Sequence, residues 1–89
     1  MKQTTGEVRA INRQSAMAGV YVTDEDGHTV LELRSANDID IGDVIEWDSG
    51  EALGIQSYRN LTKGWSAEVY VVKHGVAAAN LEVQLLVGS

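Results

Sequence analysis

The sequence contains no cysteine, no proline and no phenylalanine. Without cysteine the chain cannot form a disulfide, a thiolate zinc site or a cysteine nucleophile. Small secreted domains usually depend on disulfides, so the absence of cysteine favours a cytoplasmic location. The chain also has no proline-rich linker, no low-complexity tract and no internal repeat, which predicts a single domain over residues 1–89.

Long apolar segments are missing as well. The longest apolar run, Val69 to Val72, has the length of a strand, whereas a bilayer span needs about 18 residues. The first residues, Met1 to Gly6, are polar and lack the apolar core of a signal peptide. We therefore expect a soluble protein without a membrane partner.

Basic residues are scarce: 7 Lys and Arg stand against 13 Asp and Glu, for a net charge of -6. An acidic surface repels phosphate backbones and anionic membranes. The composition therefore argues against nucleic-acid binding, although a local basic face is compatible with it. Hydrophobic residues make up 44% of the chain, which is typical of a folded domain with a thin core.

The chain does contain short segments rich in β-branched residues, separated by turn signals. Asp26-Gly27 is a hairpin signal, and His74-Gly75 is expected to end a strand. The predicted strands span roughly residues 5–13, 18–23, 28–34, 41–47 (a turn and then a strand), 54–61 and 67–73. This spacing predicts an all-β fold, a small closed barrel of five to six strands.

The tail from Val76 to Val87 fits two structures. Leu81, Leu85 and Leu86 would share one face of a helix, whereas Leu81, Val83 and Leu85 alternate as in a strand. The composition favours a short C-terminal helix, with an extra strand that closes the barrel as the alternative.

Four segments resemble the cold-shock domain, a small barrel of the OB-fold type. They are Gly6–Asn12, Asp26-Gly27 with Val30–Leu33, Ile39–Trp47 and Gly54–Leu61. The resemblance covers about residues 6–62 and leaves 63–89 as a C-terminal extension. It implies an OB-like barrel.

Cold-shock domains bind single-stranded nucleic acid by stacking bases on exposed rings. At the matching positions this chain carries Ala10 on the first strand, Met17 and Gly19 on the second, and Leu31 and Leu33 on the third. Each stacked base contributes about 1–3 kcal/mol. The loss of every ring predicts that the resemblance extends to the fold and not to the family's usual activity.

Neither histidine has the partners that a metal site or a general base requires. His28 follows Asp24, Glu25 and Asp26, so a metal site is conceivable there, but a solvated turn histidine is the expected structure. His74 is likewise expected at the surface.

Two groups of carboxylates could in principle form a cation site or an acid–base pair. Asp38, Asp40 and Asp43 do not follow the ligand pattern of a calcium loop, so we expect a solvated turn in which Gly42 supplies the backbone freedom.

Glu46, Asp48 and Glu51 lack the groove that a glycosidase needs, and Trp47 is expected in the core. The serines have no nucleophile elbow, and the glycines form no phosphate loop. We expect no enzyme, no cofactor and no metal.

The remaining aromatic residues suggest a surface. Trp65 follows a predicted turn and is expected to pack over the barrel mouth or under the tail, with an exposed interface ring as the alternative. Tyr70 is expected within its strand. The candidate interaction surface consists of Arg9, Arg13, Tyr21, Arg34, Tyr58, Arg59 and Trp65.

Three functions follow, in decreasing order of support. The first is a non-enzymatic interaction module that binds another protein or a second copy of itself. The second is weak binding of single-stranded nucleic acid through Arg9, Arg13, Arg34 and Arg59, with Tyr21 or Tyr58 as the stacking ring. The third is a small hydrolase or metal-dependent enzyme.

Overall fold

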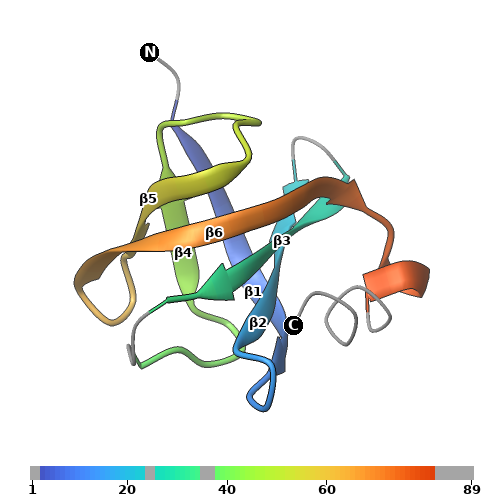
Figure 1. The fold of residues 1–89 in the computed structure, drawn as a ribbon, viewed down its shortest axis with the longest axis horizontal. Coiled ribbons are helices and arrows are strands. Elements are labelled where there is room, and N and C mark those ends of the chain that lie inside the picture. Colours follow the sequence, from blue (N-terminus) through green and yellow to red (C-terminus); the bar gives the residue numbers. More distant parts are fainter. Residues whose placement is uncertain (1–2, 24–25, 35–37, 82–89) are drawn as a thin grey trace.

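The computed structural model describes residues 3–23, 26–34 and 38–81. These residues form six antiparallel strands and one short helix, residues 78–81 (Figure 1). The strands are β1 (Thr4–Asn12), β2 (Met17–Val22), β3 (Gly27–Leu33), β4 (Val44–Trp47), β5 (Gly54–Asn60) and β6 (Trp65–Val76).

The strands close into a barrel in the order β1-β2-β3-β6-β5-β4, with β4 paired back to β1. The predicted all-β closed barrel is confirmed. β6 pairs with β5 from Trp65 to Val71 and with β3 from Val69 to Val76. Because β6 is a wall of the barrel, the closed sheet extends beyond the 6–62 segment that resembles the cold-shock domain.

The barrel interior is filled by side chains from all six strands, because alternate residues of each strand point inward. Trp47 on β4 and Tyr58 on β5 are cross-strand partners, and both are fully buried. Their rings stack with centroids 4.4 Å apart and planes 1° from parallel. Trp47 is thus the core residue that the sequence predicts. Its indole N–H donates to the Gly50 carbonyl at 3.0 Å.

A second apolar cluster lies on the outside of β2, β3 and β6. It consists of Met17, Val30, Val76 and Leu81, with Ala10 and Val72 packed against it. Leu81 comes from the short helix, which Figure 1 shows beside this side of the barrel. A Cβ atom at Gly19 would lie 2.7 Å from a Leu81 methyl carbon, so glycine makes room for the leucine. The predicted C-terminal helix is confirmed at residues 78–81, and the rest of the tail lies outside the described residues.

The expectation that β6 ends at His74-Gly75 is wrong. Gly75 takes a φ of +67°, which glycine adopts without strain, and the β3–β6 register shifts on both sides of Val30. These irregularities let β6 continue to Val76. A Cβ on Gly27 would lie 2.9 Å from the Gly75 Cα atom, so the two backbones approach closely where β6 crosses the start of β3.

Candidate functional site

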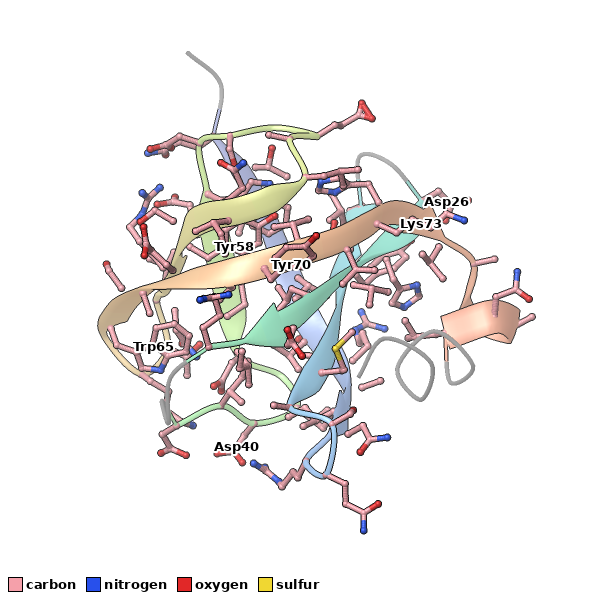
Figure 2. All side chains as sticks on the ribbon, viewed as in Figure 1. Asp26, Asp40, Tyr58, Trp65, Tyr70 and Lys73 are labelled. Carbon is pink, nitrogen blue, oxygen red and sulfur yellow. The ribbon has the colours of Figure 1, made fainter. Side chains whose placement is uncertain are left out.

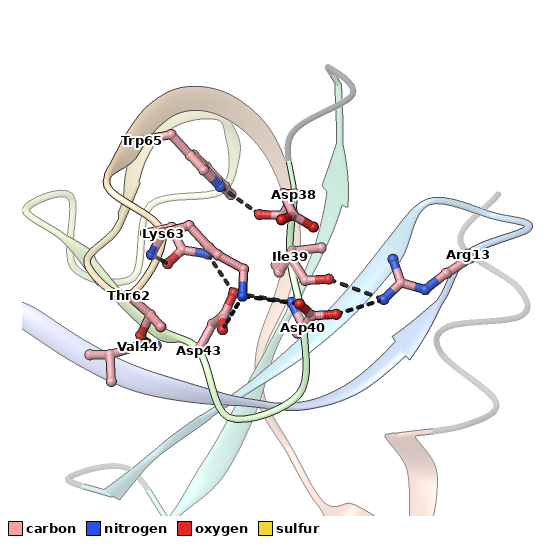
Figure 3. Close-up of polar contacts among 10 residues, drawn as sticks. Arg13, Asp38, Ile39, Asp40, Asp43, Val44, Thr62, Lys63 and Trp65 are labelled. Carbon is pink, nitrogen blue, oxygen red and sulfur yellow. Dashed lines mark hydrogen bonds and ion pairs between the residues drawn. The ribbon is translucent and has the colours of Figure 1, made fainter.

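The segment from Asp40 to Asp43 is a tight turn tied to the barrel (Figure 3). Asp43 is only 3% exposed, and its Oδ2 atom accepts hydrogen bonds from Asn60 Nδ2 at 2.9 Å and from the Asp40 N–H at 3.0 Å. Lys63 donates to its Oδ1 at 3.3 Å. The prediction of a solvated carboxylate is therefore wrong for Asp43. The φ of +95° at Gly42 confirms the role expected for that glycine.

The pKa of Asp43 reflects two opposing causes. Burial alone would raise it, but the hydrogen bonds from Asn60, from the Asp40 N–H and from Lys63 outweigh burial and lower the pKa. The carboxylate is therefore held in its charged form by donors from β5 and from the turn that follows it. These contacts form a structural network in which the Asp43 carboxylate accepts three hydrogen bonds.

Two residues of the predicted surface, Arg13 and Trp65, also hold this end of the barrel, together with Lys63. Lys63 pairs with Asp40 at 3.0 Å, and Arg13 donates to the Ile39 carbonyl at 3.1 Å and to Asp40 at 3.2 Å. The Trp65 N–H donates to the Asp38 carbonyl at 2.6 Å, while its ring packs against the inner core (Figure 3). Trp65 thus packs at the barrel mouth, as the sequence favours, and it is not an exposed interface ring.

Arg59 lies on the outside of β5 between two carboxylates of the neighbouring strand and loop. Its guanidinium contacts Glu46 at 2.9 Å and Asp48 at 3.0 Å. The hydrogen bonds to Asp48 and Glu46 raise the pKa of Arg59, and the hydrogen bond from Arg59 lowers the pKa of Asp48. Two of the three carboxylates considered for an acid–base site, Glu46 and Asp48, therefore form an ion-pair cluster with Arg59 between them.

Arg9 and Tyr21 are the two members of the predicted surface that meet. The Arg9 guanidinium lies 5.1 Å from the centroid of the Tyr21 ring. The Arg9 Nε–H donates a hydrogen bond to Glu7 Oε1 at 2.6 Å. The Tyr21 hydroxyl donates to Asp26 at 3.0 Å, and this hydrogen bond raises the pKa of Tyr21. The two side chains border a shallow, open depression, and both already have acidic partners.

Both histidines differ from their predicted positions. His28 is only 7% exposed, and its Nδ1 atom lies 3.0 Å from the Val76 carbonyl, a contact that requires the proton on Nδ1. His74 is half-buried and contacts Thr29 Oγ1 at 2.9 Å and the Ala52 carbonyl at 3.3 Å. The crossing of β6 over β3 buries them. In the described ranges, no three His, Asp or Glu residues are grouped as a metal site would require.

Tyr58 must be removed from the candidate surface, because it is 0% exposed and stacks on Trp47 inside the barrel. Arg34 is exposed just after β3. The seven predicted residues thus do not form one surface. Arg9 with Tyr21, Arg13 with Asp40, and Arg59 with its carboxylates are separate local groups.

The positions matched to the cold-shock platform are also not free. Met17 lies under the C-terminal helix with Ala10 packed against its cluster, and Leu81 lies over Gly19. On β3 the residues matched to the platform lie on the inner side of the strand and not on its outer side. Leu31 lies in the inner core, and Leu33 packs against it. Outward positions of β3 carry Val30 and Glu32, whose cross-strand partners on β6 are Lys73 and Tyr70.

A different exposed surface was missed by the sequence analysis. Ile55 on β5 and Tyr70 on β6 are direct cross-strand partners, and each is 44% exposed. Leu53, two residues before Ile55, is 56% exposed. Figure 2 shows Tyr70 on the near side of β6, with Lys73 further along the same strand. We call this surface the Tyr70 face and define it by Leu53, Ile55, Tyr70 and the charged residues around them, Glu32, Arg34, Glu68 and Lys73.

The signal that would have located the Tyr70 face is the alternation within β5 and β6. Val69 and Val71 point inward, so Tyr70 between them must point outward. The expectation for Tyr70 gave its strand but not the side of the strand on which its ring lies.

Comparison with known proteins adds no family: no family model matches the chain, no curated protein is similar to it, and no solved structure matches its fold. Within the described residues, no helix has the length and apolar character needed to cross a bilayer. The chain's own residues are therefore the basis for a functional assignment.

Proposed function

We propose that this protein is a non-enzymatic interaction module that binds a protein partner through the Tyr70 face. The observation that supports this proposal is the exposed cross-strand pair of Ile55 and Tyr70 on a closed barrel. A tyrosine beside an isoleucine on a rigid strand surface offers apolar area with little loss of side-chain entropy on binding. The barrel would act as a scaffold that holds this pair in place.

The surroundings of the pair favour a protein over a nucleic acid. Glu32 is the cross-strand partner of Tyr70 on β3, and Glu68 lies two residues before Tyr70 on β6. These two carboxylates would repel a phosphate placed beside the ring, while Lys73, three residues further along β6, adds a positive charge to the face. A protein surface has both apolar and charged groups and suits this mixture.

A photo-crosslinking amino acid placed at position 70 tests the proposal in the cell of origin. The same amino acid at Thr62, an exposed residue of the β5–β6 turn, is the matched control. We expect discrete protein adducts from position 70 and none of the same mass from position 62. Identical adducts from both positions, or adducts from neither, would refute a protein-binding Tyr70 face.

A second candidate function rests on one contact, the Arg9 guanidinium over the Tyr21 ring. The closed antiparallel barrel is consistent with an OB-like relation. Such a relation would make weak binding of single-stranded nucleic acid at Arg9 and Tyr21 reasonable. Glu7 and Asp26 oppose it, because they already occupy Arg9 and the Tyr21 hydroxyl.

Fluorescence anisotropy of a mixed oligonucleotide pool at low salt tests this candidate. Binding that weakens with salt and disappears in Arg9→Ala would support it, and no binding at high micromolar protein would remove it. For a hydrolase or metal-dependent enzyme, the described residues offer no three-residue ligand cluster to start from.

A further inference from the structure

We propose that the partner at the Tyr70 face is a second copy of this chain, packed face to face across a two-fold axis near Tyr70. This inference rests on the proposed function, since it names the partner of the same surface. The distribution of paired and unpaired charges and the order of those charges along β6 support it.

Most described basic side chains already have a carboxylate partner within their own chain. Salt bridges join Arg9 to Glu7, Arg13 to Asp40, Arg59 to Glu46 and Asp48, and Lys63 to Asp40 and Asp43. The two exceptions among the described residues are Arg34 and Lys73, which form no salt bridge there.

Both exceptions lie around the Tyr70 face. Lys73 is the cross-strand partner of Val30 on the outer side of the sheet. Arg34 follows Leu33, whose partner is Val69, so the antiparallel register places its backbone beside Glu68. Glu32 and Glu68 likewise form no salt bridge with described residues. The exposed apolar pair is thus surrounded by two acidic and two basic residues whose charges balance.

A balanced set of charges distinguishes a second copy from other partners. The whole chain carries a net charge of -6, so two copies repel each other over most of their surfaces. A uniformly acidic face would favour a basic partner, and a uniformly basic face would favour an anion. A neutral face with both signs lets two copies of a strongly acidic protein meet.

The order of the charges on β6 is self-complementary. Glu68 lies two residues before Tyr70 and Lys73 three residues after it. In an extended strand these two side chains are about 16 Å apart, too far to pair with each other. A two-fold axis that brings Tyr70 against Tyr70 of the second copy reverses β6, so each Glu68 approaches the Lys73 of the other copy. Isologous contacts of this type form the commonest soluble dimers.

Sedimentation velocity over a range of concentrations tests the inference. We expect the wild-type chain to shift from monomer to dimer with increasing concentration. Tyr70→Ser should abolish the shift. Glu68→Lys and Lys73→Glu should each raise the dimer Kd about fivefold or more, because each change places like charges together twice in the dimer. The double exchange Glu68→Lys/Lys73→Glu should restore the Kd to within about twofold of wild type.

Asp38→Lys is the matched control, since it makes the same charge change at an exposed position beside the Trp65 end of β6. It should leave the Kd within about twofold of wild type. A circular dichroism spectrum and a thermal melt check that every variant is folded, and recovery by the double exchange separates a lost contact from a lost fold.

Two results would overturn the inference. A chain that remains monomeric at the highest concentration contradicts it, and so does a dimer that persists unchanged in Tyr70→Ser. If the chain is monomeric while position 70 still crosslinks to a different protein, the second copy is excluded and the proposed function stands. If position 70 also yields no adduct, both fail.

Discussion

The outer wall of this barrel has two apolar regions with different cover. Over β2 and β3, Met17 and Val30 are fully buried under Leu81 of the C-terminal helix. Over β5 and β6, Ile55 and Tyr70 are each 44% exposed. In the described structure, the chain uses its own C-terminal segment to cover one region and leaves the other uncovered. The difference indicates that the first region contributes to stability, whereas the second remains exposed to solvent.

The largest expected effect comes from the Asp43 network at the end of the barrel, which belongs to neither region. In Asp43→Ala, the buried Asn60 amide and the Asp40 N–H lose their acceptor, which should reduce the free energy of unfolding by about 3 kcal/mol. Urea denaturation measures this loss. Asp38→Ala, which removes an exposed carboxylate nearby, should change stability by less than about 0.5 kcal/mol. Equal losses in the two variants would mean that Asp43 is not the residue that holds this end of the barrel.

The same carboxylate predicts the direction of the pH dependence. Since the folded-state pKa of Asp43 is lowered, its contribution is complete above about pH 4, where the carboxyl of the unfolded chain is ionised. The contribution is lost as the pH falls through the folded-state pKa. Urea midpoints measured from pH 7 down to pH 2 should therefore decrease below about pH 4, and less steeply in Asp43→Asn. A variant with an unchanged acid profile would contradict this role.

A matched pair of substitutions tests the two regions against each other. Leu81→Asp removes the apolar cover from Met17 and Val30 and should cost about 2 kcal/mol. It should also increase the binding of a hydrophobic dye. Ile55→Asp makes the same change in side-chain chemistry at an exposed strand position and should cost less than about 1 kcal/mol. If Ile55→Asp costs as much as Leu81→Asp, the two regions do not differ as described.

A small effect on stability is expected at Tyr70. Tyr70→Ser removes an exposed ring from the middle of β6 and should reduce the free energy of unfolding by less than about 1 kcal/mol, mainly through lower β propensity. Thermal and urea unfolding of the same variant that is used in sedimentation would show this. A loss of several kcal/mol would mean that the ring stabilises the barrel and is not reserved for a partner.

The strand pattern was sufficient for the architecture of this protein. Valines and leucines at alternate positions, with Asp26-Gly27 between β2 and β3, predict the closed barrel, and the helical character of the tail is confirmed at residues 78–81. The predicted end of β6 was wrong because a glycine can either end a strand or occupy the positive-φ position of a bulge within the strand. Gly75 is the second kind.

The candidate surface was less predictable, because it depends on which residues meet across the barrel. Tyr58 is an exposed ring or a core ring depending on the direction of its side chain, and the structure places it against Trp47. Likewise, the burial of His28 depends on a carbonyl 48 residues away in sequence. No local pattern around either residue carries that information. The alternation of Val69, Tyr70 and Val71 does carry this information, because it places the Tyr70 ring on the outer side of β6.

The most direct test of self-association through the Tyr70 face is a concentration series of amide chemical shifts. We predict that amides of Ile55, Ser57, Glu68 and Tyr70 shift progressively as the protein is concentrated, while those of Ala10, Met17 and Gly19 stay fixed. Shifts confined to the covered region, or none over the whole range, would contradict the account.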